Sequence, residues 1–388
     1  MAAAQTITVV SESPALPEFK GWRPARQAAL LTFGFRLFYS FVAALFSPRL
    51  ALNENLIRSN RLTDHLMSRR LHPILYSLLG VWERFDTLWY IEIARHGYDK
   101  PMATVFYPLY PILIRAVSVL TRSELAAAPL ISTGATFFLF WGALRLFDLD
   151  GTSPASTRAI LLWAVWPASF VFFAGYPDSL VCALIVWSLV LARSGRWLPA
   201  SALGLLAGLT KAMGCLAAVP LLWIAWKDRR KEGLLAAASS LAGAACYQGW
   251  LLLRHFPSAA EVYRTWWMTT TVAPWITLRD AFHAAVQGRD TLVLLNLIVF
   301  ALAGLAALLP SVRGECRLYA VAAMCLFLTK HTDPLLQSTT RYSLTLFAAY
   351  PALAAKLGRG VPFAIVLLLS AALNILLFRV FLDWGLVV

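Results

Sequence analysis

The sequence is poor in charged residues, and it lacks the nucleotide-binding motifs of many soluble enzymes. Charged residues make up 14% of the 388 positions, whereas hydrophobic residues make up 59%. Soluble domains are typically about 25% charged and roughly 45–50% apolar. No Walker loop is present, and no Gly-x-Gly-x-x-Gly motif follows an expected strand. The composition therefore predicts an all-α polytopic membrane protein without a nucleotide site.

Cysteine and histidine are also scarce, and neither has the spacing of a metal site. The chain has 5 cysteines and 6 histidines, with no Cys-x-x-Cys pair and no His-x-x-x-His pair. We therefore expect no disulfide framework, no metal and no cofactor. Sequons of the form Asn-x-Ser/Thr are absent as well. This absence favours a bacterial inner membrane over a eukaryotic endoplasmic reticulum membrane.

Positive charge is abundant, but it is not arranged as a nucleic-acid-binding face. The net charge is +14, and Lys and Arg gather in short clusters between apolar runs, as in residues 227–231, 313–317 and 356–359. Such clusters are typical of the cytoplasmic loops of membrane proteins. We expect membrane lipids as partners, and no nucleic acid.

The apolar runs are long enough for about eleven transmembrane helices. A spanning helix needs about 20 mostly apolar residues, because lipid cannot satisfy its backbone groups. The cytoplasmic N-terminal tail is expected over residues 1–26, followed by a single transmembrane domain over 27–388. The expected spans are 27–47, 124–147, 158–175, 179–193, 196–210, 213–226, 233–254, 291–310, 317–331, 341–357 and 362–382.

The apolar stretch 105–121 is interpreted as a helix on the outer surface rather than as a span. Excluding it places all the basic clusters on the same side as the N-terminal tail, in agreement with the positive-inside rule. Pro108 and Pro111 also remove backbone donors near its start. The first outward loop would then cover residues 48–123, and loops of that length usually carry function.

Apolar residues within this loop recur at helical spacing from Leu71 to Ile93, which predicts one amphipathic surface helix with interfacial character. On such a helix Asp86 would project into the apolar stripe, where a carboxylate needs a partner or a cavity. One alternative is an ion pair with Arg84 or Arg95 that anchors the loop. The other is a carboxylate at the entrance of a site, directed at a hydroxyl group.

Two segments of this loop carry a family resemblance. Residues 82–98 read Trp-Glu-Arg-Phe-Asp-Thr-Leu-Trp-Tyr-Ile-Glu-Ile-Ala-Arg-His-Gly-Tyr, and residues 106–111 read Phe-Tyr-Pro-Leu-Tyr-Pro. The pair closely resembles the signature of the PIG-V family, with Tyr107 where Phe is usual. Shorter similarities occur at 173–180, with Asp178 in place of Glu, at 208–214, with Lys211 in place of Arg, and at 338–342.

The resemblance implies a GT-C-like fold and a mannosyltransferase. Such enzymes transfer a mannosyl or other hexosyl unit from a polyprenyl- or dolichyl-phosphate-sugar donor on the outer, non-cytoplasmic face. Inversion of the anomeric centre would give an α-linkage to an acceptor glycan, lipid or protein that the sequence does not name. Asp86 would be the catalytic base, and Lys211 and Arg341 would bind the donor phosphate.

Further residues are candidates for the substrate site, and several have structural alternatives. Lys211 can instead extend to the interface, Arg341 can be a flanking charge, and Asp178 can cap the next helix. Arg36 lies within the first span, where it either serves a site or pairs with another helix. The substrate-site candidates are Trp82, Arg84, Trp89, Tyr90, Tyr98, Tyr107, Tyr110, Tyr176, Asp178 and Tyr342.

The alternative function is that of a polytopic lipid or sugar transporter, or flippase, without transferase activity. Transporters often have paired halves with interrupted helices and sites at the midplane. No internal repeat is evident here, and the charged candidates gather at one expected surface. A non-catalytic scaffold of the same fold is the third possibility.

Overall fold

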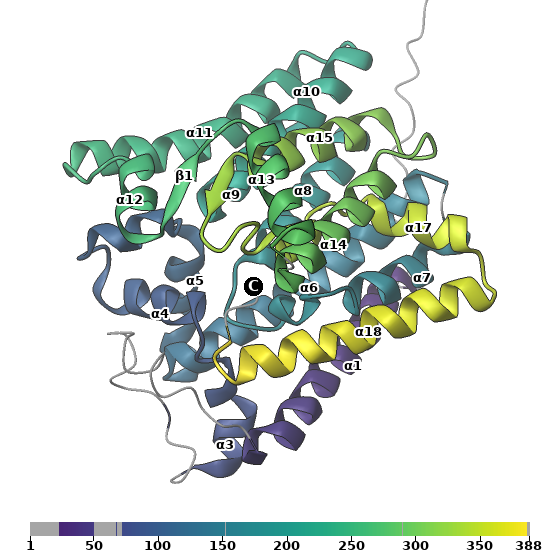
Figure 1. Cartoon of the computed structure of the whole chain (residues 1–388). Coiled ribbons are helices and arrows are strands. Elements are labelled where there is room, and N and C mark those ends of the chain that lie inside the picture. Colours follow the sequence, from purple (N-terminus) through teal and green to yellow (C-terminus); the bar gives the residue numbers. More distant parts are fainter. Residues whose placement is uncertain (1–22, 50–66, 68–71, 152, 289, 386–388) are drawn as a thin grey trace, which may run out of the picture.

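The computed structural model describes residues 23–49, 67, 72–151, 153–288 and 290–385 (Figure 1). Most of the expected N-terminal tail and part of the expected outward loop 48–123 lie outside these ranges. Within them the chain is mostly helical, and its one sheet pairs two short strands, β1 and β2, antiparallel. An all-α fold is therefore confirmed.

The elements follow one another along the chain with short connections. The α-helices and strands are α1 Arg23–Phe46, α3 Pro73–Leu78, α4 Asp86–His96, α5 Leu109–Thr121, α6 Glu124–Leu149, α7 Ser153–Ala164, α8 Asp178–Arg193, α9 Trp197–Thr210, α10 Ala218–Lys227, α11 Glu232–Leu253, α12 Ala259–Trp266, β1 Thr269–Thr271, α13 Pro274–Val286, α14 Thr291–Ala307, α15 Gly314–Leu328, β2 Lys330–Thr332, α16 Thr339–Ser343, α17 Ala349–Leu357 and α18 Val361–Leu382. Short 3-10 helices are η1 Ser47–Arg49, η2 Gly80–Trp82, η3 Pro101–Val105, η4 Ser169–Phe172 and η5 Ala212–Ala217.

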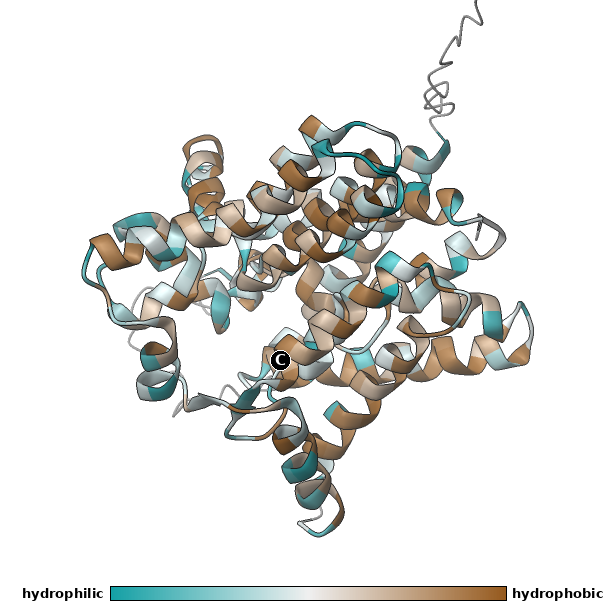
Figure 2. Ribbon diagram, turned by 90° about the horizontal axis from the view of Figure 1, so that it is seen from above, coloured by the Kyte–Doolittle hydropathy of each residue, from teal (hydrophilic) through white to brown (hydrophobic). Residues whose placement is uncertain are grey.

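Three helices of the described chain, α1, α6 and α18, are by length and composition able to cross a membrane. Apolar helices of 10–17 residues also occur at Leu109–Thr121, Trp197–Thr210, Ala212–Lys227 and Thr291–Ala307. Figure 2 shows that most residues along the helices are hydrophobic, while hydrophilic residues occur mainly near helix ends and in connecting segments. The chain thus has the character of a membrane protein.

The expected span 158–175 is not one continuous helix. Helix α7 ends at Ala164, and Ala168 has a φ of 69° just after Pro167. Proline lacks the N–H group that would continue the helix, which explains the break. Asn374 of α18 compensates for the lost helical bonds by donating to the Trp166 carbonyl at 2.6 Å.

The expected span 341–357 is also divided, into α16 and α17. Between them the backbone forms turns with bonds to the third residue back, such as the 3.1 Å bond from Leu346 N to Ser343 O. Pro351 in the first turn of α17 has no N–H group to donate backward. As a result Arg341 lies in a separate five-residue helix.

The single amphipathic helix expected from Leu71 to Ile93 is wrong. The described part of this stretch consists of α3, η2 and α4, separated at Leu79 and at residues 83–85. Phe85 has a φ of 47°, a conformation that is costly for a residue with a side chain and that interrupts any helix. Asp86 therefore begins a new helix rather than lying on a long stripe.

Helix α5 is shorter than the thickness of a bilayer. Its 13 residues extend about 20 Å at 1.5 Å per residue, against roughly 30 Å of hydrocarbon. Several apolar side chains on it are highly exposed, including Val119 at 77% and Leu120 at 85%. Helices α9 and α10, which are expected to span the membrane, have 14 and 10 residues. Length therefore does not distinguish α5 from them, and the position of α5 on the outer surface stays a prediction.

Helices α9 and α11 pack with their backbones in close approach. A Cβ on Gly208 would lie 2.4 Å from the Ser240 carbonyl oxygen, and one on Gly243 would lie 2.2 Å from that of Leu205. Gly204 and Gly208 form the Gly-x-x-x-Gly spacing that permits such contact between membrane helices. This packing fixes the end of α9, where Lys211 is located.

Candidate active site

Two carboxylates and two cations, contributed by separate elements, form a charged cluster at helix ends. Asp86 is the first residue of α4, Asp178 is the first residue of α8, and Lys211 follows the last residue of α9. Acids are favoured at helix N-termini and cations at C-termini by the helix dipole. Each of these three side chains thus occupies an electrostatically favourable position before any pair forms.

Arg341 of α16 connects the two carboxylates. Its Nη1 donates to Asp86 Oδ2 at 2.9 Å, and its Nε lies 3.8 Å from Asp178 Oδ1. Lys211 Nζ lies 2.9 Å from the same Asp178 oxygen. The convergence predicted for Lys211 and Arg341 therefore occurs, at a carboxylate that the two cations share.

A third cation, Lys330, belongs to the cluster and was missed by sequence reasoning. The cationic groups of Lys211, Lys330 and Arg341 lie 5.4, 5.5 and 5.4 Å from the centre of the Tyr342 ring. Lys330 was assigned to the end of the span 317–331, although α15 ends at Leu328. The signal that could have found it is a lysine at the same expected outer surface as Lys211 and Arg341.

Lys330 is held in place by the sheet and by two phenols. Strand pairing sets Lys330 opposite Thr271 of β1, and its Nζ lies 3.4 Å from the Tyr263 hydroxyl. Burial disfavours its charged form, but the neighbouring Tyr263 and Tyr342 outweigh burial and raise the pKa of Lys330 above its usual value. The group is therefore cationic at neutral pH.

The members of the cluster differ in their exposure. The side chain of Asp178 is fully buried, that of Arg341 is 7% exposed, that of Lys211 is 19% exposed and that of Asp86 is 25% exposed. Asp86 is thus the carboxylate that an incoming molecule can reach. Asp178 instead serves to hold the two cations next to it.

The two tyrosines of the cluster flank Arg341. Its guanidinium carbon lies 5.2 Å from the Tyr176 ring centre on one side and 5.4 Å from that of Tyr342 on the other. The Tyr176 hydroxyl is buried and has no hydrogen-bond partner among the described residues.

Two structural alternatives from the sequence are wrong. Asp178 does not cap α8, because Pro177 occupies the cap position and the Asp178 carboxylate binds Lys211. Asp86 does not pair with Arg84 or Arg95. Its partner Arg341 lies 255 positions further along the chain.

The remaining candidates make contacts within the protein framework. Trp82 stacks on Phe378, Trp89 stacks on Phe106, Tyr90 packs edge-on against Tyr110, Tyr98 donates to the Phe106 carbonyl, Tyr107 contacts Tyr247, and Tyr110 donates to the Ala128 carbonyl. These contacts shape the loop that carries Asp86. In the absence of a ligand, these side chains therefore have structural roles.

Two arginines singled out in the sequence also have framework roles. Arg84 is buried, donates to the Tyr76 hydroxyl at 2.8 Å and stacks over Trp384 at 4.6 Å. Arg36 donates to the Phe173 carbonyl at 2.8 Å and lies 5.2 Å over Trp82. Both therefore fasten the segment before α4 to the transmembrane helices.

The sequence Asp148-Leu149-Asp150 lies at the end of α6. Here Asp150 forms an ion pair with Arg193 and lies 3.7 Å from Arg313. No group of three or more potential metal ligands occurs among the described residues.

Comparisons with known proteins give no relative: no family model, no curated protein and no solved structure matches the chain. The PIG-V resemblance therefore depends on the sequence segments quoted above alone.

Proposed function

We propose that the protein is a GT-C-like membrane glycosyltransferase that uses a polyprenyl-phosphate-linked hexose, mannose in the first instance, as donor. The observation that carries the proposal is the meeting of Asp86, the most exposed acid of the cluster, with three cations around Tyr342. Transfer from a lipid phosphate requires this combination, since a base must accept a proton while cations receive the departing phosphate.

The charge balance of the cluster suits a phosphodiester donor. Lys211, Lys330 and Arg341 contribute three positive charges, and Asp86 and Asp178 contribute two negative charges. One positive charge is left over, which matches the single negative charge of a phosphodiester. The donor phosphate would accept charge-assisted hydrogen bonds from Arg341 and the two lysines.

The transfer step keeps this balance. The acceptor hydroxyl oxygen attacks the anomeric carbon, the bond from that carbon to the phosphate oxygen breaks, and Asp86 takes the hydroxyl proton. The departing polyprenyl phosphate gains a second negative charge as Asp86 loses its own. Arg341, released from Asp86, can then pair with the phosphate, so the cluster is neutral before and after transfer. Attack from the face opposite the phosphate inverts the anomeric centre and gives an α-linkage from a β-linked donor.

The finer topology belongs to the same proposal. Eleven spans with a cytoplasmic N-terminus would place the cluster on the outer face of a bacterial inner membrane. Helical segments near all the expected spans support this arrangement. In a eukaryotic cell the equivalent face is the lumen of the endoplasmic reticulum.

The test is incubation of purified protein with polyprenyl-phosphate-mannose and a panel of acceptors, following loss of donor by mass spectrometry. Wild-type protein should consume donor, and the Asp86→Asn variant should not. Solute counterflow that is unaffected by Asp86→Asn, without donor loss, would favour the transporter instead.

A further inference from the structure

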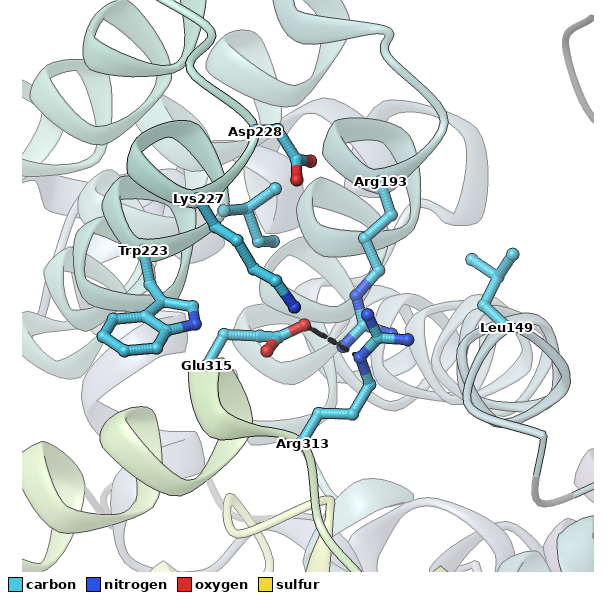
Figure 3. Close-up of a pocket in the computed structure, with 8 residues that line it drawn as sticks. Leu149, Arg193, Trp223, Lys227, Asp228, Arg313 and Glu315 are labelled. Atoms are coloured by element: carbon cyan, nitrogen blue, oxygen red, sulfur yellow. Dashed lines mark hydrogen bonds and ion pairs between the residues drawn. The ribbon is translucent and has the colours of Figure 1, made fainter. Parts of the chain in front are cut away.

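A second charged site lies far from the candidate active site, at the other end of α8. Asp178 begins this 16-residue helix and Arg193 ends it, so the two lie roughly 22 Å apart along the axis at 1.5 Å per residue. At the Arg193 end, the ends of α8, α10 and α15 surround a cavity of about 190 Å³ (Figure 3). An adjoining cavity of about 530 Å³ extends over Trp226 and Arg317.

Internal ion pairs occupy some of the charges in this pocket. Glu315, which is buried, accepts from Arg193 at 2.7 Å and from Arg313 at 3.2 Å. Asp150 pairs with Arg193 as well. Figure 3 shows the side chains of Arg193, Arg313 and Lys227 extending into the space around Glu315.

Two cations of the pocket have no acid partner. Lys227 and Arg317 line the cavities, and neither forms an ion pair with another residue that the structure describes. Asp228 also lines the pocket. Among the described lining residues it is the one acid that forms no ion pair, so its negative charge opposes the binding of an anion. The pocket therefore retains two free positive charges against one free negative charge, and it favours an anion of charge −1.

Apolar side chains around the pocket indicate the kind of anion. Trp226 is 70% exposed, Leu222 is 47% exposed and Leu318 is 39% exposed, on the helices that carry Lys227 and Arg317. Trp223 lines both cavities, and its ring lies 5.2 Å from that of Trp226. Tryptophans of this kind lie at the level of lipid headgroups, with acyl chains beside them.

We propose that this pocket binds an anionic phospholipid of the surrounding membrane, with the phosphate between Lys227 and Arg317 and the acyl chains along Leu222, Trp226 and Leu318. Basic pockets between transmembrane helices are suited to anionic lipid headgroups. The lipid would fasten α10 to α15 on the side of the membrane opposite the candidate active site. This inference depends on the pocket alone and not on the proposed glycosyl transfer.

Native mass spectrometry of the purified full-length protein in detergent tests the proposal. Phosphatidylglycerol and phosphatidylcholine with the same acyl chains are titrated separately, and inorganic phosphate is added as a competitor. We expect phosphatidylglycerol to bind more tightly than phosphatidylcholine, and millimolar phosphate not to displace it. Equal binding of the two lipids would overturn the proposal, and displacement by phosphate alone would show a free-anion site instead.

Variants at the pocket make the test specific. Loss of one cation near a lipid surface weakens anionic lipid binding about fivefold, so Lys227→Gln should have this effect and Lys227→Gln with Arg317→Gln a larger one. Lys231→Gln, which removes the same charge from an exposed position four residues away, should leave binding unchanged. Because neither pocket residue forms an ion pair, both variants should fold. An equal loss of lipid binding in the Lys227 and Lys231 variants would overturn the proposal, because overall charge rather than this pocket would then determine binding.

Discussion

Asp178 is expected to be essential for stability, because it is the acid that Lys211 and Arg341 share. Its side chain is fully buried, and Asp178→Asn would leave both cations without it. Breaking a buried ion pair costs about 3–5 kcal/mol, because a buried charge loses its compensation. Lys211 is 19% exposed and Arg341 keeps Asp86, so the lower end, about 3 kcal/mol, is the expected loss.

The assay is thermal unfolding of the purified protein in detergent, followed by intrinsic fluorescence. A loss of this size should lower the apparent unfolding temperature of a 388-residue chain by about 4 °C. Asp99→Asn is the matched control, since Asp99 forms only an exposed contact with Lys100 at 4.0 Å, and surface pairs of this kind contribute little. If Asp178→Asn unfolds within about 1 °C of the wild type, the buried cluster does not hold the two cations as described.

Three further predictions concern the donor site, the packing and the topology. Lys330→Gln should weaken donor binding about 10–100-fold in a titration with donor, as expected for loss of a charged hydrogen bond to phosphate; unchanged affinity would remove Lys330 from the site. Gly208→Ala should destabilise the protein by about 1–3 kcal/mol in the same unfolding assay, whereas Gly249→Ala, with open space around it, should not; equal effects would exclude close helix packing as the cause. Cysteines placed at Leu120 and Ser123 should react with an impermeant reagent from outside the cell, and labelling from the cytoplasmic side would reverse the proposed orientation.

Helix positions could be predicted from the sequence because burial in lipid imposes long apolar runs. Helix α8 was expected over 179–193 and begins one residue earlier, and α18 was expected over 362–382 and also begins one residue earlier. Hydropathy does not register backbone geometry, so the breaks after α7 and α16 were not anticipated. Pro167 and Pro351 were the available signals for them.

Partners within the candidate site were harder to predict, because they join distant parts of the chain. The Asp86–Arg341 pair spans 255 positions, and no local spacing rule reaches that far. A regular helix was assumed through Phe85, whose positive φ cannot be inferred from composition. Lys211 and Arg341 could be grouped because both lie at the same expected outer surface, and the same reasoning extended to Lys330 would have completed the cluster.

In the proposed mechanism, Asp86 is a base for glycosyl transfer rather than an anchor for its loop. Asp86→Asn keeps the size of the side chain and can still accept a hydrogen bond from Arg341, but it removes the basic group. The direct measurement is the rate of polyprenyl-phosphate-mannose consumption by the purified variant and the wild type, with donor binding and unfolding temperature as controls. We predict a fall of about 100- to 10,000-fold in rate, with donor still bound and the fold retained. Transfer by Asp86→Asn at a rate close to that of the wild type would contradict the assignment.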